Sequence, residues 1–511
     1  MRRGILAAAL ALSVAGAALA QGGEPRFAVA GYRVEGESPL SESETQALLA
    51  PFAGPAVTLE RLQAAAAALE AELKARGHGF LRVVLPPQDT GGTITLRVLA
   101  FRLGEAAVRG NTAFSAANVR ASLPALRPGE SPNLREIARD QALANEHPAK
   151  QVSVTMRQGT KPDTVDAEVA VRDAKPLRYF ASLANTGSPQ TGHWRASIGA
   201  QHSNLWDRDH SLTGSYTTSP GHWGDVSQYG LFYNAPFYAA GGALSAFTSY
   251  SDVSSGTIAN VFQVSGRGRF SGLRWKQQLL PHGAYAHTLE GGVEDRHFLN
   301  DVTFNGTPIG TNLRSRPLVA AYGARYEFAG GMLRGSLEYA RNLGGGRDNT
   351  DAAYAANRAG ADARWQAWRA SFDAQRAFGE WTGALRVRAQ ATREPLASGE
   401  QFGFGGAAGV RGLREREVTG DTGWTASLEA VSPALREGLR ALAFMDAGQA
   451  RLRNAPAGQA ARLGSASIGA GLRWAPAAGV SVSVDYARVH DAAVVTGKGD
   501  ERLHVLVSAQ F

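Results

Sequence analysis

The side chains that could do chemistry in this sequence are acids, hydroxyls, arginines and 11 histidines, and they form no recognised catalytic motif. There is no G-x-S-x-G, no H-E-x-x-H and no phosphate-binding loop, since Gly497-Lys498-Gly499 lacks the loop and the following Ser or Thr. The histidines lack metal-ligand spacing, and zero Cys excludes disulfides, iron–sulfur sites and Cys-based zinc sites. We therefore predict no enzyme activity, no catalytic residue, no cofactor and no metal site.

The chemistry that remains is pairing between guanidinium and carboxylate groups. Alternation along a strand places Glu429 on one face with the polar residues Thr425 and Ser427. Asp446 shares its strand face with Leu442, Phe444 and Gly448, so composition alone does not turn that face toward water. An arginine can bind a carboxylate through two parallel hydrogen bonds, but a fully exposed pair contributes only ~0–1 kcal/mol. Such pairs are therefore expected to stabilise a structure only where the fold keeps them away from solvent.

Composition narrows the class of protein that could confine them. The chain has 511 residues, 44% of them hydrophobic, with 53 Lys and Arg against 45 Asp and Glu. The two charge signs are mixed, and no basic tract is dense enough to predict binding to nucleic acid. No stretch after the N-terminus reaches 18 consecutive apolar residues, which excludes a helical membrane protein. A soluble protein and a transmembrane β-barrel both remain, because a barrel alternates lipid-facing and lumen-facing residues.

The N-terminus predicts export. Arg2 and Arg3 precede an apolar stretch from Ile5 to Ala17, and Ala18-Leu19-Ala20 has the small-x-small form of a cleavage site. Residues 1–20 are therefore predicted to be a signal peptide, with a short linker at 21–26. A short membrane anchor is the alternative, but the stretch is too short to span a bilayer comfortably.

Two repeats follow, at 27–100 and 101–176. At an offset of 74, Val34 meets Val108, Gly36 meets Gly110 and Ser41 meets Ser115. Each repeat reads as β-α-α-β-β, with Ser41 and Ser115 as N-caps of the first helices. The apolar stripe of the second helix in the first repeat is Leu59, Leu62, Ala66, Leu69 and Leu73, and we expect it to cover its own sheet. A free sheet edge of either repeat could take up an extended polypeptide as an added strand.

Residues 177–511 consist of alternating strands. In the last segment Leu503, Val505 and Val507 alternate with His504 and Ser508. A soluble sandwich also shows one apolar and one polar face, but aromatic residues near the segment ends resemble the interfacial girdles of a membrane barrel; they are Tyr179, Trp194, Trp206, Tyr216, Trp424, Trp474 and Tyr486. We predict a closed antiparallel barrel of about 16 strands, with long connections at 300–316, 343–363 and 398–423.

Several motifs occur in an order that resembles one known family. They are Gly110-Asn111 with Phe114-Ser115, Ser182–Gly187, Asn204-Leu205-Trp206 with Asp209, Val410-Arg411-Gly412-Leu413, Phe444-Met445-Asp446-Ala447-Gly448, and the terminal Phe511. With two preceding repeats of the POTRA type, this set is similar to the two-partner secretion transporters (the TpsB family, ShlB/FhaC/HecB) of the POTRA–barrel superfamily. Leu413 departs from the family pattern, which usually has an aromatic residue there, and 21–26 leaves no room for the N-terminal plug helix of many members.

The resemblance implies a fold, a location and roles for residues. POTRA units at 27–100 and 101–176 would lie in the periplasm, and the barrel at 177–511 would lie in the outer membrane of a Gram-negative bacterium. The loop around 398–423 would fold into the lumen, where Arg411 of its tip would pair with Asp446. Glu429, which alternation turns inward with Thr425 and Ser427, is the expected second partner. Phe511 would be read by the barrel-assembly machinery. Partners would be a secreted β-rich exoprotein of the adhesin or haemolysin type, periplasmic chaperones and membrane lipid.

Two other functions are compatible with the same elements. A barrel assembly or insertion factor would act through an opening seam between the first and last strands, Tyr179–Asn185 and Leu503–Phe511. A passive porin or a surface adhesin would need no POTRA units, so deleting 27–176 would leave its function intact.

Overall fold

A computed structural model describes residues 25–511, except for 90, 253–256, 259–261, 264–266, 300–302, 305–306, 309–311 and 456. The predicted signal peptide at 1–20 and residues 21–24 of the predicted linker lie outside the described residues. The chain forms two compact units. One extends to Arg102 and includes Ser131–Asn133; the other contains Leu103–Glu130 and Leu134–Phe511.

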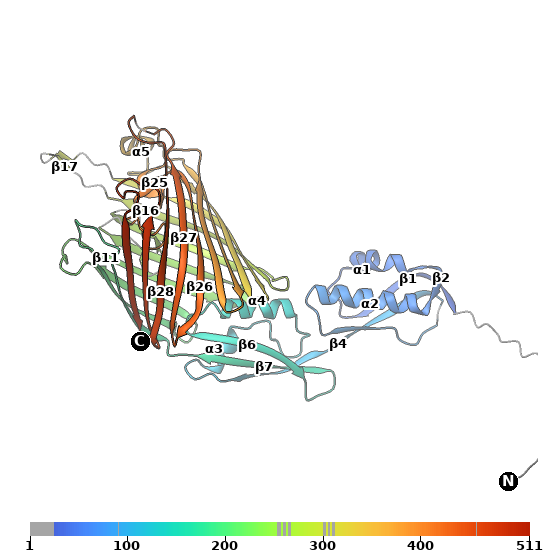
Figure 1. The fold of residues 1–511 in the computed structure, drawn as a ribbon. Coiled ribbons are helices and arrows are strands. Elements are labelled where there is room, and N and C mark those ends of the chain that lie inside the picture. Colours follow the sequence, from blue (N-terminus) through green and yellow to red (C-terminus); the bar gives the residue numbers. More distant parts are fainter. Residues whose placement is uncertain are drawn as a thin grey trace, which may run out of the picture. The chain divides into compact units, whose positions relative to one another are not determined.

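The first unit is a small sheet covered by two helices (Figure 1). Its elements are β1 (Arg26–Gly36), α1 (Glu42–Leu49), η1 (Ala50–Phe52), β2 (Gly54–Thr58), α2 (Leu59–Ala75), β3 (Leu81–Val84) and β4 (Gly92–Ala100), and its strand order is β2-β1-β4-β3. Ser41 and Glu44 form a capping box at α1, and Thr58 caps α2. Strand β2 is additional to the predicted β-α-α-β-β order. The predicted stripe of α2 is buried from Leu62 to Leu73, but Leu59 is 47% exposed because it is the first residue of the helix.

The second unit begins with a repeat in the predicted order. It contains β5 (Arg102–Arg109), α3 (Ala116–Ala121), α4 (Leu134–Ala144), β6 (Lys150–Gln158) and β7 (Thr164–Asp173), and its strand order is β5-β7-β6. Val119, Leu123 and Val169 belong to its core. Ser115 caps α3 as predicted, and Gly110 needs its φ of +83° at the preceding turn, where a Cβ would strike the carbonyl of Val171.

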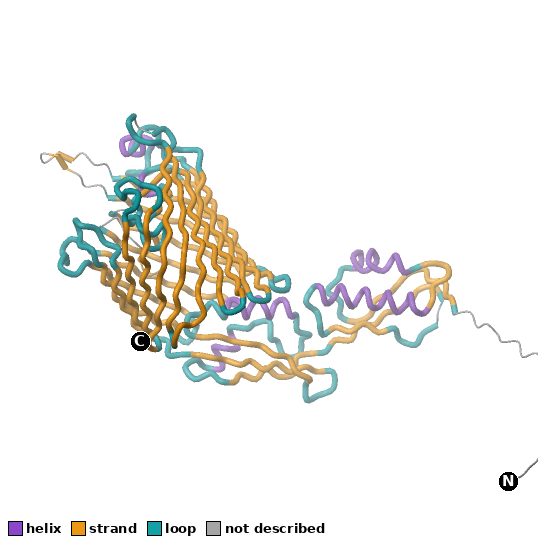
Figure 2. Tube along the Cα trace, in the orientation of Figure 1, coloured by secondary structure: helices purple, strands orange, loops and turns teal. Residues whose placement is uncertain are grey.

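The rest of the second unit is a closed barrel (Figure 2). Its wall consists of β8 (Leu177–Ala184), β9 (Arg195–Leu205), β10 (His210–Thr218), β11 (Gln228–Phe237), β12 (Gly242–Ser251), β15 (Gly268–Gln278), β16 (Tyr285–Phe298), β19 (Leu313–Ser315), β20 (Pro317–Phe328), β21 (Gly331–Asn342), β22 (Gln366–Phe378), β23 (Trp381–Ala391), β26 (Thr422–Arg436), β27 (Leu439–Arg451), β28 (Arg462–Ala477), β29 (Val480–Val489) and β30 (Glu501–Gln510). Strands β19 and β20 both pair with β16 and are separated only by Arg316, so the wall has 16 strands, as predicted.

Strand β30 closes the barrel against β8. The register pairs Ser508 with Ser182, and Phe511 and Tyr179 exchange backbone hydrogen bonds of 2.9 and 3.1 Å. The first wall strand is thereby paired with the last, and closure of this kind is the condition for a sheet to span a bilayer. None of the helices in the described part of the chain combines the length and apolar character that a membrane span needs.

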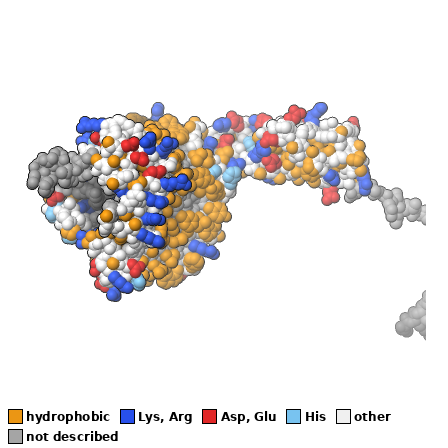
Figure 3. Space-filling view, turned by 90° about the horizontal axis from the view of Figure 1, so that it is seen from above, with side chains coloured by type: hydrophobic (Ala, Val, Ile, Leu, Met, Phe, Trp, Pro, Cys, Tyr) orange, Lys and Arg blue, Asp and Glu red, His pale blue; other side chains and the backbone are white. Residues whose placement is uncertain are grey.

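The outer surface of the barrel is apolar, as a lipid-facing wall must be (Figure 3). Ile198 is 62% exposed, and the same outward positions of other strands carry exposed Leu, Val, Met and Ile side chains. All seven aromatic residues predicted to form interfacial girdles are exposed, from Tyr216 at 39% to Trp206 at 72%. The inner face carries the polar side chains, so the alternation read from the sequence is confirmed.

The connections between wall strands differ in their structure. The predicted loop at 343–363 contains α5 (Asp351–Asn357), whose fully buried Tyr354 packs in a core shared with wall strands and with Leu396 and Ala397 of the β23–β26 connection. Short hairpins lie in two other connections, β13 (Thr257–Ile258) with β14 (Phe262–Gln263) and β17 (Thr303–Phe304) with β18 (Thr307–Pro308), and η2 (Tyr238–Ala240) joins β11 to β12. Much of the predicted loop at 300–316 lies outside the described residues.

Candidate functional site

The connection between β23 and β26 packs against the inward side chains of the barrel wall. It contains η3 (Ser398–Glu400) and a hairpin of β24 (Phe402–Phe404) with β25 (Val418–Gly420). We call 396–404 with 418–421 the root of this loop, and 405–417 its tip. Gly405 and Gly406 have φ of +122° and +83°, which lets the chain turn out of β24 into the tip.

Arg411, in the tip, is enclosed by acidic groups of the wall. Its Nε and Nη2 donate to the two oxygens of Asp446 at 2.7 and 2.8 Å, and its Nη1 donates to Glu429 at 2.8 Å. The guanidinium also lies 3.4 Å from the ring centroid of Phe444. The Arg411 side chain is 4% exposed, and those of Asp446 and Glu429 are 0% and 5% exposed. This is the confined geometry in which a bidentate pair contributes most.

Alternation along β27 explains how Asp446 reaches Arg411. Leu442, Phe444 and Asp446 are buried on the inner face, whereas Met445 between them is 57% exposed on the outer face. The apolar residues of this parity therefore face the lumen, where Phe444 supports the guanidinium. Composition alone could not have assigned this face.

The other motif residues shape the contact between loop and wall. Val410 and Leu413 are fully buried in a cluster with Phe404, Val418 and Val489. Gly412 has a φ of +95°, and a Cβ there would lie 2.8 Å from Val489. A Cβ at Gly448 would lie 3.1 Å from the Phe404 ring, so this glycine lets the root approach β27.

Sequence reasoning missed several residues that complete this cluster. Asp485 lies 3.5 Å from Arg411 and is bound by Arg473, and Arg386 binds Glu429 at 3.1 Å. His504 accepts a hydrogen bond of 2.9 Å from the backbone N–H of Gly412. The cluster thus contains three arginines (Arg386, Arg411 and Arg473) and three carboxylates (Glu429, Asp446 and Asp485), so its formal charges cancel. The available signal was the alternation itself, which puts Asp485 and His504 on the polar face of β29 and β30.

A second buried cluster joins the repeat at 101–176 to the β9–β10 hairpin of the barrel. Lys150 of β6 forms an ion pair with Asp209, and both side chains are fully buried. Asn118 accepts from Lys150 at 2.7 Å and donates to Asp209 at 2.8 Å, while the Tyr238 hydroxyl donates to Asp209 at 2.6 Å. Burial lowers the pKa of Lys150 below that of an exposed lysine, although Asp209 partly offsets this. The hairpin motif Asn204–Asp209 therefore carries an attachment point that sequence reasoning did not identify.

The same repeat has a groove beside its edge strand. The groove has a volume of about 260 Å³ and is lined by Gly104, Glu105, Ala106, Arg120, Leu123, Leu126, Pro128 and Val169. Strand β5 is at the edge of its three-stranded sheet, and no other strand among the described residues pairs with its outer side. The backbone of Leu103, at the start of β5, already bonds Gly129 and Glu130. Beyond it, a partly apolar groove beside a strand edge suits an extended peptide.

Comparison with known proteins identifies the family. The profile described as haemolysin secretion/activation protein ShlB/FhaC/HecB matches residues 164–474, and the ShlB-type POTRA domain profile matches 27–100. The chain belongs to the ShlB/FhaC/HecB family. This is a family of secretion transporters, so the barrel lies in the outer membrane and the POTRA region lies in the periplasm.

Individual members of the family are distant in sequence. The outer membrane transporter CdiB of Escherichia coli is 23% identical over 416 residues, which cover 78% of this chain and 68% of that protein. The heme/hemopexin transporter protein HuxB of Haemophilus influenzae is 24% identical over 160 residues, or 31% and 28% of the two chains. The solved structure of CdiB from Escherichia coli matches with a TM-score of 0.79 over 98% of this chain and 93% of that one, at 19% identity. This likeness shows a shared fold.

Proposed function

We propose that this chain is a translocase that captures a secreted partner exoprotein in the periplasm and exports it through the barrel. The observation that carries the proposal is the clamped tip, a loop inside a closed barrel whose arginine is enclosed by carboxylates of the wall. A passive porin has no need of POTRA units. The partner would be a β-rich exoprotein of the adhesin or haemolysin type, and the protein would have no catalytic role.

The contact between the tip and the acidic groups of the wall would act as the gate of the passage. Val410, Arg411, Gly412 and Leu413 would form its moving side, and Phe444, Asp446, Gly448 and Glu429 its fixed side. Supporting this, the Arg411 contacts are charge-assisted and side-chain mediated, so they can break and re-form without unfolding a strand.

The remaining assignments concern organisation and biogenesis. We propose a signal peptide at 1–20, a short linker at 21–26, POTRA units at 27–100 and 101–176, and the barrel at 177–511. Phe511, 75% exposed at the end of β30, would be the contact for the barrel-assembly machinery, and periplasmic chaperones would deliver the unfolded chain.

The capture step would use the groove beside β5. Ala106→Trp should fill it and lower export of the partner by roughly tenfold, equivalent to ~1.4 kcal/mol of lost binding. The measurement is the amount of partner exoprotein that reaches the medium at equal barrel levels. Ala174→Trp, at an exposed position after β7, is the matched control and should export normally. Equal export by both variants would remove the groove from the capture step.

A second candidate function, insertion of other barrels through a lateral opening, is favoured by the seam. The ladder between β30 and β8 is short, from Leu506 to Gln510 with one further backbone pair between Phe511 and Tyr179. The side chain of Asn185 extends it by bonding the backbone of Leu503 and Val505 at 2.7 and 2.8 Å. A disulfide across this seam should abolish insertion but leave export through the lumen intact.

A further inference from the structure

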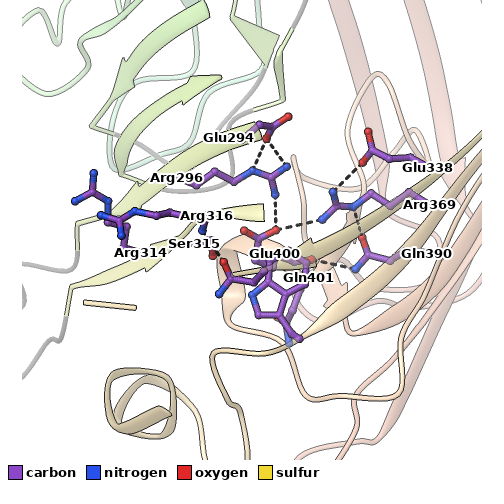
Figure 4. A network of polar contacts seen from close by, with 12 residues as sticks. Glu294, Arg296, Arg314, Ser315, Arg316, Glu338, Arg369, Gln390, Glu400 and Gln401 are labelled. Atoms are coloured by element: carbon purple, nitrogen blue, oxygen red, sulfur yellow. Dashed lines mark hydrogen bonds and ion pairs between the residues drawn. The ribbon is translucent and has the colours of Figure 1, made fainter. Parts of the chain in front are cut away.

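The root of the inward loop is attached to a different part of the wall from the tip. Arg411 of the tip reaches β26, β27 and β29, whereas Glu400 of the root binds Arg296 of β16 and Arg369 of β22 (Figure 4). The Glu400 side chain is fully buried. The loop is thus held at two separate places on the barrel wall.

The Glu400 contacts belong to a larger ion-pair network. Arg296 also binds Glu294, and Arg369 also binds Glu338 at 3.1 Å and Gln390 at 3.0 Å. Arg274 joins the network by binding Glu294, Glu290 and Glu338. A carboxylate bridging two arginines that are themselves paired is expensive to remove, because several buried charges would lose partners together.

A second buried carboxylate ties the two sides of the root to each other. Asp421 accepts from the backbone N–H of Leu396 at 2.9 Å and of Arg453 at 2.6 Å, and from Arg358 at 2.7 Å. The Gln390 amide donates to the carbonyls of both Glu400 and Asp421, at 3.0 and 3.1 Å. The root is therefore bound within itself as well as to the wall.

The chain turns sharply at both boundaries between the root and the tip. Gly405 and Gly406 have positive φ where β24 ends, and Arg416 has a φ of +48° just before β25. The tip is fixed to the wall by Arg411 and by Gly412, whose N–H donates to His504 and whose carbonyl accepts from Arg502. Glu417 attaches the tip to the β29–β30 connection by accepting from the backbone of Val495 and Thr496 at 2.7 and 2.6 Å. None of these polar contacts involves a residue of the β24–β25 pairing, although Val410 and Leu413 of the tip pack on Phe404 and Val418 of the root.

We propose that the root is a fixed base, that only residues 405–417 move when the passage opens, and that Glu400 and Asp421 are the positioning residues that hold the base in place. The passage opens by rotation of the tip about Gly405–Gly406 and not by withdrawal of the whole loop. This inference rests on the proposed role of the tip as a gate.

Distance measurements between nitroxide labels test this without any cargo. The chain has no Cys, so introduced cysteines are the only labelling sites. A reference label replaces Glu437, exposed in the β26–β27 turn, and the second label replaces either Arg414 of the tip or Thr419 of the root. The distance distributions are recorded in purified full-length protein for the parent and for two variants. One variant carries Arg411→Ala, and the other carries both Glu400→Gln and Asp421→Asn.

We expect Arg411→Ala to broaden the 414–437 distribution and to leave the 419–437 distribution as narrow as in the parent. Glu400→Gln with Asp421→Asn should broaden the 419–437 distribution, and Glu380→Gln, an exposed acid in the β22–β23 turn, should change neither. If the double variant does not form a heat-modifiable folded barrel, Glu400→Gln combined with Gln390→Leu replaces it and should likewise broaden the 419–437 distribution.

Two outcomes would overturn the inference. Broadening of the root distance by Arg411→Ala would show that the whole loop moves as one body. An unchanged root distance in the Glu400 and Asp421 variant would show that these carboxylates do not hold the base. Failed export by the parent protein would count against the proposed function alone, because the label distances do not depend on cargo.

Discussion

Replacing Arg411 with alanine is expected to leave a folded barrel that conducts ions more freely and exports its partner poorly. The substitution leaves Asp446 and Glu429 enclosed without their shared cation, which destabilises the clamped state by about 3–5 kcal/mol. Each ~1.4 kcal/mol changes a population tenfold, so the closed state should lose its dominance. Conductance in planar bilayers, heat-modifiable mobility and secreted exoprotein together report the result.

The matched control is Arg414→Ala, which removes an exposed arginine from the same tip. It should behave like the parent. Arg411→Lys should rescue only partly, since an ammonium cannot make the bidentate contact with Asp446. Normal conductance and normal export by Arg411→Ala would remove the gating role.

Exchanging the two charges is a poor test of pairing, because an aspartate at position 411 would face Glu429 and Asp485. A double-mutant cycle of Arg411→Met and Asp446→Asn tests the pairing without placing a new negative charge beside Glu429 and Asp485. If the two residues act through their contact, the double variant should differ from the sum of the single changes by ~0.5–3 kcal/mol in the closed-to-open balance.

The second large effect is expected at Lys150. Lys150→Met leaves the fully buried Asp209 without its cation at the junction between the second repeat and the barrel, at a cost of about 3–5 kcal/mol. The repeat should then separate more readily from the β9–β10 hairpin. Limited proteolysis in the segment between β7 and β8, residues 174–176, should become faster, and export should fall because captured cargo is no longer held at the barrel entrance.

Lys175→Met is the control, since this lysine is exposed in the same region and should change stability by less than ~0.5 kcal/mol. Adding Asp209→Asn to Lys150→Met should recover part of the loss by removing the uncompensated charge. Equal proteolysis rates for Lys150→Met and Lys175→Met would show that the ion pair does not secure the junction.

Much of the fold could be predicted because it depends on local periodicity. Alternation such as that from Leu503 to Phe511 separates lipid-facing from lumen-facing positions, and Ser41 and Ser115 mark helix starts through caps formed within three residues. The strand β2 was missed because Gly54–Thr58 is short and takes its pairing with β1 from residues distant in sequence. No local pattern encodes such an edge strand.

The candidate site could be predicted only in part, for a related reason. The resemblance supplied Arg411 and Asp446, and alternation supplied Glu429, but the residues that surround them lie on strands far away in sequence. Arg473 and Asp485 meet because β28 and β29 pair in one particular register. Glu400, Asp421 and Lys150 belong to no motif, and their importance follows from burial, which the sequence does not display.

The most direct test of the account asks where the exported chain travels. A photo-crosslinking residue is placed on β9 at either Gln201, which faces the lumen and bonds Thr213, or Ile198, which is 62% exposed on the outer face. With a partner exoprotein stalled during export, the account predicts adducts at position 201 and none at 198. Adducts at the seam residue Leu183, with none at 201, would contradict passage through the lumen.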